Sequence, residues 1–152
     1  MKTLRHPWLA GLAFCLLSAG AFAPAFARDC QPQLREGWVR LGPAGMPMMA
    51  GFGRIENRCK APVTITGASS PAFGSVELHE TRLVDGVNRM RAVPELRIAP
   101  DDAAVLKPGG LHLMLMRPHA PLQAGSKVVV QFELAGGGTL LGEFEVRKPN
   151  AL

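Results

Sequence analysis

Hydrophobic and polar residues alternate most clearly between Leu111 and Met116, where the sequence is Leu-His-Leu-Met-Leu-Met. In an extended chain, successive side chains point to opposite faces, so the three leucines share one face and His112, Met114 and Met116 share the other. A face of three leucines requires a hydrophobic core. The pattern therefore predicts a β-strand whose opposite face carries an imidazole and a thioether roughly 7 Å apart.

Other short segments follow the same period of two residues and are separated by turn-forming residues. Val63 and Ile65 alternate with Thr64 and Thr66, as in a half-buried strand. After residue 27, no segment of ten residues has a helical period. We therefore predict an all-β sandwich, with strands within residues 38–41, 46–57, 60–67, 76–80, 87–93, 96–98, 103–106, 111–116, 127–134 and 139–146.

Asp85 and Gly86 form the residue pair that favours a two-residue turn in a β-hairpin. Counting outward from this turn pairs Val84 with Val87, Glu80 with Arg91, Thr81 with Met90, His79 with Ala92, and Arg82 with Arg89. His79 and Met90 then become diagonal neighbours on one face, within reach of long side chains. The pair of arginines is the one unfavourable contact in this register, because like charges lie opposite each other.

The beginning of the chain has the pattern of a secretory signal peptide. Lys2 and Arg5 precede an apolar run at residues 8–22, and the sequence Ala-Phe-Ala follows at residues 25–27. We therefore expect cleavage after residue 27 during export to the periplasm. The remaining chain, residues 28–152, is long enough for one domain and too short for two.

Two forms of membrane attachment are disfavoured by the same segment. The apolar run is short for a bilayer span and is followed by Pro24. A lipid anchor on Cys15 is disfavoured because the bulky Phe14 stands where a small residue is needed. We expect no stable membrane anchor.

Charge and motifs exclude two classes of function. The formal net charge is +5, and loss of Lys2 and Arg5 lowers it to +3. This charge is spread along the sequence, whereas nucleic-acid binding requires a basic stripe with interleaved aromatic residues. No Gly-x-Ser-x-Gly, His-Glu-x-x-His or paired-carboxylate arrangement is present, so we expect no enzymatic activity.

Two of the three cysteines, Cys30 and Cys59, remain after cleavage of the signal peptide. In an exported protein an even pair favours a disulfide. The alternative is a pair of thiolate metal ligands, but these cysteines lack a close spacing and would be oxidised outside the cytoplasm. We predict a disulfide remote from any metal.

His79, Met90, His112 and Met114 are candidate metal ligands, because each His-Met pair falls on one face of its own predicted strand or hairpin. A single histidine or methionine in a β-protein is usually structural, so the argument depends on the set. Imidazole with thioether sulfur suits Cu(I). Zinc is a poor candidate for two thioethers, and a blue-copper site would need a cysteine ligand.

The spacing of these four residues resembles the copper motif of the PCuAC family of periplasmic copper chaperones. His79 is followed after ten residues by Met90, after twenty-one more by His112, and after one more by Met114. The segments His-Glu-Thr at 79–81, Asp-Gly-Val at 85–87 and Lys-Pro-Gly-Gly-Leu-His-Leu-Met-Leu-Met at 107–116 also resemble the family.

This resemblance implies a cupredoxin-like, Greek-key β-sandwich that binds Cu(I) through His79, Met90, His112 and Met114. It also implies a monomer that supplies copper for assembly of the CuA centre of cytochrome c oxidase. The implied partners are cytochrome c oxidase subunit II and a Sco-type thioredoxin-fold protein, which would provide thiol chemistry. The alternative is a metal-free structural or adhesion sandwich.

Four methionines and one histidine outside this set have other expected roles. Met116 shares the face of His112 and Met114, and of the two roles open to it, shielding the metal or packing at the sheet edge, we expect the second. The group Met46, Met48 and Met49 is either an apolar segment leading into the next strand or an accessory copper-capture loop. His119 is expected in a solvated loop.

Overall fold

The computed structural model describes residues 30–43 and 46–150, and these residues form ten β-strands. No helix in this part of the chain is long and apolar enough to cross a membrane. The predicted signal peptide lies outside the described residues. The strands are Gln33–Arg40 (β1), Met48–Asn57 (β2), Val63–Ser69 (β3), Phe73–Val84 (β4), Val87–Ala92 (β5), Leu96–Ile98 (β6), Asp102–Leu106 (β7), Leu111–Pro118 (β8), Lys127–Leu134 (β9) and Thr139–Arg147 (β10).

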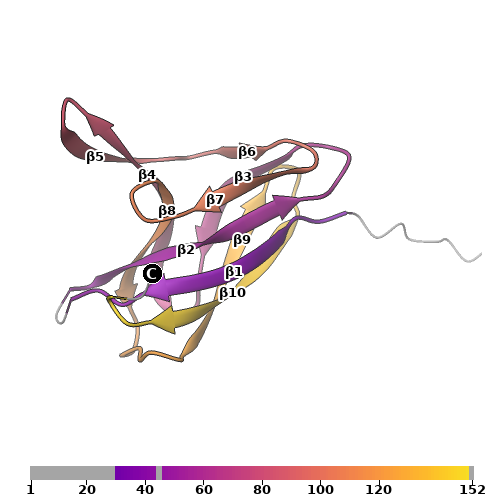
Figure 1. Cartoon of the computed structure of the whole chain (residues 1–152). Helices are drawn as coiled ribbons and strands as arrows, with labels where there is room; N and C mark the ends of the chain where they lie inside the picture. Colours follow the sequence, from indigo (N-terminus) through magenta and orange to yellow (C-terminus); the bar gives the residue numbers. More distant parts are fainter. Residues whose placement is uncertain (1–29, 44–45, 151–152) are drawn as a thin grey trace, which may run out of the picture.

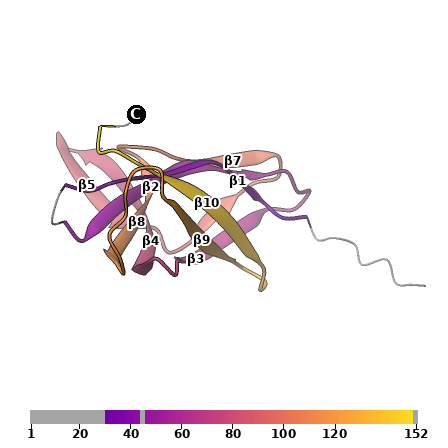
Figure 2. The same cartoon turned by 90° about the horizontal axis from the view of Figure 1, so that it is seen from below.

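The strands form one sheet that closes on itself around the core (Figure 1). Its order is β5-β4-β8-β2-β1-β10-β9-β3-β6, with β7 paired to β2 and an additional pairing between β3 and β4. All pairs are antiparallel except β1 with β10, which run parallel. The turn between β9 and β10 lies at the end opposite the hairpin of β4 and β5 (Figures 1 and 2).

Alternation of side chains explains the core. Along β9 and β10 every second residue is buried, including Val130, Phe132, Phe144 and Val146. Leu113 and Leu115 on β8 are fully buried among them, and Leu111 packs partly buried against the same core. The predicted leucine face of β8 is therefore confirmed, and its other face is left for different chemistry.

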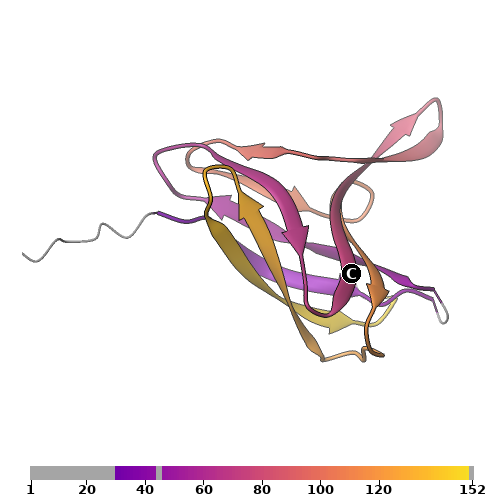
Figure 3. The ribbon, with the colours of Figure 1, turned by 180° about the vertical axis from the view of Figure 1, so that it is seen from behind.

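The hairpin of β4 and β5 has the predicted register, with Thr81 opposite Met90 and His79 opposite Ala92. Asp85 and Gly86 have φ angles of 52° and 76°, as a type I′ turn requires at both central residues. The hairpin projects from the body of the molecule in Figures 1 and 3, and every residue of β5 is exposed. β5 is also an edge strand.

Arg82 and Arg89 lie opposite each other as predicted, and Arg82 forms an ion pair with Glu80. Arg82 Nε lies 2.7 Å and Arg91 Nη2 lies 2.9 Å from Glu80 Oε2. Hydrogen bonds from Arg82 and then Arg91 lower the pKa of the Glu80 carboxyl. One carboxylate therefore neutralises charge on both strands of the projecting hairpin.

β1 and β4 differ most from the predicted strands, for physical reasons. β1 begins at Gln33, where residues 38–41 were predicted, because a register shift between Arg35 and Trp38 interrupts the two-residue period, and Glu36 has a φ of 53°. β4 continues to Val84 beyond the predicted end at residue 80, because both faces of the projecting hairpin are exposed and need no hydrophobic alternation.

Cys30 and Cys59 form the predicted disulfide, with their Cα atoms 5.5 Å apart. Next to it, the buried Asn57 side chain donates hydrogen bonds to the carbonyl oxygens of Ala61, Ile98 and Ala99 and accepts one from the Cys59 N–H. These contacts join β2 to the segments after β2 and β6. Along β2, this end is roughly 16 Å from Phe52, by the rise of a strand.

Removal of the disulfide should destabilise the fold without changing its strands. The bridge spans a sequence separation of 29 residues, and the chain-entropy model gives such a loop about 3.5 kcal/mol of stability. We expect the Cys30→Ala, Cys59→Ala double variant to lose this amount in urea unfolding, with an unchanged far-UV circular dichroism spectrum. An equal free energy of unfolding in the variant and the oxidised parent would contradict this account.

Candidate metal centre

The candidate ligands come together on the outer face of three adjacent strands. β8 lies between β4 and β2, and its antiparallel register places His112 directly opposite His79 on β4. One step along the same face, Met114 lies opposite Glu77 on β4 and Ala50 on β2. Because paired residues point to the same side of a sheet, these side chains share a face.

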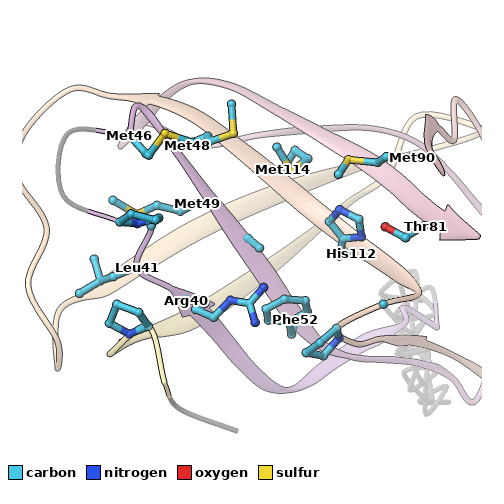
Figure 4. Close-up of a pocket in the computed structure, with 16 residues that line it drawn as sticks. Arg40, Leu41, Met46, Met48, Met49, Phe52, Thr81, Met90, His112 and Met114 are labelled. Carbon is cyan, nitrogen blue, oxygen red and sulfur yellow. The ribbon is translucent and has the colours of Figure 1, made fainter. Parts of the chain in front are cut away.

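A surface cavity of about 480 Å³ opens over this face, and Figure 4 shows the residues that line it. Three of the four predicted ligands, Met90, His112 and Met114, line this cavity. His79 is not among the lining residues, but its ring centroid lies 6.3 Å from that of His112. The structure therefore brings the four side chains to one place, with His79 at the margin of the cavity.

His112 is held in a defined orientation. It is buried on β8, its Nδ1 lies 2.8 Å from the Gly110 carbonyl oxygen, and its ring lies 6.4 Å from that of Phe52. A carbonyl oxygen can only accept, so Nδ1 donates the hydrogen. The neutral ring consequently keeps the lone pair on Nε2. This is the arrangement by which a second hydrogen bond orients a metal-binding histidine.

His79 is oriented in the same way through its other nitrogen. Its Nε2 lies 3.0 Å from Glu77 Oε2, two residues earlier on the same face of β4. The carboxylate accepts this hydrogen bond, so the neutral ring keeps its lone pair on Nδ1. That Nδ1 is buried and has no hydrogen-bond partner among the residues that the structure describes. An unpartnered, buried acceptor atom is costly unless another group binds it, which favours a role as a ligand.

The two methionines differ in exposure. Met114 is half-buried on the central strand β8, whereas Met90 is 53% exposed on the edge strand β5. Thr81, opposite Met90, also lines the cavity. In Figure 4 the sulfur of Met90 lies above the His112 ring, on the same side as Met114.

The donor set decides which metals fit. Among the described residues, no group of three or more His, Cys, Asp and Glu side chains could hold a metal ion. Cys30 and Cys59 are not available, because they are bonded to each other. What remains is two imidazole nitrogens and two thioether sulfurs, a set suited to a soft, monovalent ion.

Several residues around this face were not predicted. Glu77 and the Gly110 carbonyl orient the two histidines, while Phe52 packs against His112. The guanidinium carbon of Arg40 lies 5.2 Å from the Phe52 ring centroid at the edge of the cavity. The two-residue spacing of Glu77 and His79 was the available signal, since it puts both on one face of a strand.

The structure also corrects the expectation for Met116. This residue does not lie at a sheet edge, because β8 is flanked by β4 and β2. It lies opposite Ser75 on β4 and Met48 on β2. The predicted edge position was wrong because residues distant in the sequence supply both neighbours. His119 is exposed, as expected, and its Nδ1 lies 3.1 Å from the Pro71 carbonyl oxygen.

Solved structures share this fold. The Cu(I)-bound form of DR1885 from Deinococcus radiodurans is 27% identical, with a TM-score of 0.65 over 83% of this chain and 85% of that chain. The copper-bound PCuAC domain from PmoF2 is 18% identical, with a TM-score of 0.63 over 76% of this chain and 92% of that chain, and at this identity it shows the fold alone. The fold is thus the cupredoxin-like β-sandwich of PCuAC domains, and both the predicted fold class and the predicted resemblance are confirmed.

The chain belongs to the LpqE-like family, described as "Putative lipoprotein LpqE-like", which matches residues 33–146. A relative from Leifsonia xyli subsp. xyli, named "Putative lipoprotein Lxx21020", is 37% identical over 134 residues, which cover 86% of this chain and 79% of the relative.

The hydrogen bonds to the two imidazoles make a testable prediction about their tautomers. In neutral, metal-free protein, ¹⁵N-detected histidine spectra should show His79 protonated on Nε2 and His112 on Nδ1. Glu77→Ala should convert His79 to a mixture of tautomers and leave His112 unchanged, because only His79 loses its acceptor.

Glu80→Ala is the matched control, since this carboxylate is the next acidic residue on β4 and contacts arginines instead of histidine. It should leave both tautomers as in the parent. A parent protein with His79 protonated on Nδ1 would show that the Glu77 hydrogen bond does not set the free nitrogen.

Proposed function

We propose that this protein is a Cu(I)-binding copper chaperone whose ligands are His79, Met90, His112 and Met114. The observation that carries the proposal is the pair of histidines, each with one ring nitrogen engaged as a donor and the other left as an acceptor, beside two thioethers. It is supported by the shared fold and 27% identity with Cu(I)-bound DR1885.

The donor types suit copper handling under oxidising conditions. Thioethers need no deprotonation and cannot form disulfides, so a His and Met site keeps its affinity for Cu(I) where free thiols would be lost. The cost is possible oxidation of the methionines to sulfoxides. The same reasoning explains why the two cysteines serve the fold and the methionines serve the metal.

Transfer requires that the ion can be reached. Met90 lies on the projecting hairpin and is 53% exposed, so a ligand from a partner can replace its sulfur first. His112 and Met114 lie on a strand paired on both sides and retain the ion until the partner is engaged. Exchange of one ligand at a time avoids release of a free ion.

We further propose that the protein acts after export, with residues 1–27 removed as a signal peptide. Relatives named as lipoproteins support export and allow a lipid anchor in those proteins. Delivery to the CuA centre of cytochrome c oxidase subunit II, with a Sco-type protein supplying the thiol chemistry, is what the resemblance to the PCuAC family implies.

Substitution of the sulfur ligands tests the binding site. Met90→Leu and Met114→Leu preserve volume and apolarity while removing the donor atom. Each should weaken Cu(I) binding more than about tenfold in anaerobic competition with a chromogenic chelator, because even loss of an outer-shell partner costs about 10–100-fold.

Met49→Leu is the matched control, because Met49 also borders the cavity but packs against the core. Its affinity and circular dichroism should equal those of the parent. If Met90→Leu and Met114→Leu both bind Cu(I) as tightly as Met49→Leu does, the sulfur ligation is wrong, and a metal-free structural sandwich becomes the better explanation.

Delivery needs a separate measurement. Cu(I)-loaded protein should transfer copper to a soluble CuA domain with reduced cysteines, as detected by native mass spectrometry, faster than the same concentration of Cu(I)-chelator complex does. Met90→Leu should change this transfer rate. Equal rates from the protein and the chelator would refute delivery to this recipient while leaving Cu(I) binding intact.

A further inference from the structure

A second group of methionines lies beside the four proposed ligands on the same face. Met46 and Met48 line the cavity and are 47% and 37% exposed. Met116 lies directly opposite Met48 and is half-buried. In Figure 4, Met46 and Met48 continue the row that Met114 and Met90 form along one side of the cavity.

The register places the sulfur atoms of this group within mutual reach. Opposed residues in an antiparallel pair have Cβ atoms about 4.5–5.5 Å apart, and diagonal neighbours are about 7–8 Å apart. Met48 and Met116 are opposed, and Met114 is the diagonal neighbour of Met48. Long, unbranched methionine side chains can close either distance onto one ion.

Met46 belongs to the same arrangement because its segment is attached to β8. The Arg117 N–H donates to the Pro47 carbonyl oxygen at 2.7 Å, and the Met46 N–H donates to the Pro43 carbonyl oxygen at 3.0 Å. These backbone bonds hold Met46 next to the end of β8 that carries Met116.

Packing alone explains Met49 but not its neighbours. Met49 points to the opposite face of β2 from Met48, lies opposite Leu115 and packs against the core. Met46 and Met48 leave much of their surface in water, so burial contributes little stability at these two positions. The protein therefore presents thioethers to solvent at the mouth of the cavity that contains Met114.

We propose that Met46, Met48 and Met116 form a second, thioether-only site that captures Cu(I) and passes it to Met114. This inference rests on the proposed function of the neighbouring site. The class of ligand follows from the donors: three sulfurs and no carboxylate favour a soft, monovalent ion over hard divalent ions. The Arg117 guanidinium, which donates to Ser75 Oγ at 3.1 Å opposite Met116, adds a positive charge that repels a divalent ion more strongly than a monovalent one.

The direction of transfer follows from the two donor sets. Passage to Met114 exchanges one Cu–S contact for another, so copper stays in the +1 state and no proton is released, because thioethers carry none. The second site lacks imidazole, and it therefore binds Cu(I) more weakly than the site with two histidines. Copper captured at the exposed methionines moves toward His79 and His112.

Methyl NMR can follow the two sites separately in one titration. Protein labelled with ¹³C at the methionine methyl groups is titrated anaerobically with Cu(I) acetonitrile complex from zero to three equivalents. The first equivalent should shift the Met90 and Met114 methyl signals. The second should shift those of Met46, Met48 and Met116, while Met49 remains unchanged throughout.

A double variant tests the same point by stoichiometry. Met46→Leu, Met48→Leu should bind one equivalent of Cu(I) where the parent and Met49→Leu bind two, with affinity for the first equivalent within about twofold of the parent. Unshifted Met46 and Met48 signals up to three equivalents, or two equivalents bound by the double variant, would overturn the second site. Failure of the proposed function looks different, because the Met90 and Met114 signals would then stay unchanged at the first equivalent.

Discussion

The register between β4 and β8 is the constraint on which both the core and the candidate site depend. The same ladder that sets Leu78 opposite Leu113 in the core sets His79 opposite His112 on the outer face. A slip of one residue would reverse every side chain of the strand and turn the imidazole into the hydrophobic core in place of a leucine. The hydrophobic effect acting on the leucines therefore positions the metal ligands, without any contribution from a metal.

This coupling explains why half of the site could be predicted from local sequence. The alternation in residues 111–116 assigns faces without knowledge of neighbouring strands, and the Asp-Gly turn fixes the hairpin register by counting alone. Both inferences use contacts between residues close in the sequence. The pairing of β4 with β8 does not, because it joins His79 to His112 across three intervening strands, β5, β6 and β7.

The features that could not be predicted depend either on contacts between residues far apart in the sequence or on irregular backbone. The Gly110 carbonyl orients His112 only because the turn before β8 brings it to the ring. The shift near Glu36 hides the beginning of β1, since a bulge breaks the period on which the prediction depends. Met116 was misplaced at an edge because its neighbours Met48 and Ser75 come from distant segments. Glu77 is different, because its spacing from His79 was visible in the sequence.

The candidate ligands are also divided by how firmly the fold holds them, and this division bears on function. His112 and Met114 belong to a strand paired on both sides, and the His112 ring is fixed by Gly110 and Phe52. Met90 belongs to an exposed edge strand on a hairpin where Glu80 pairs with Arg82 and Arg91. Strand edges open at lower free energy than core strands do, so Met90 can move without disturbing Leu113 or Leu115. A site in which two of the four ligands are rigid and Met90 is movable can bind an ion tightly and still exchange it, because the step that begins release does not require the core to unfold.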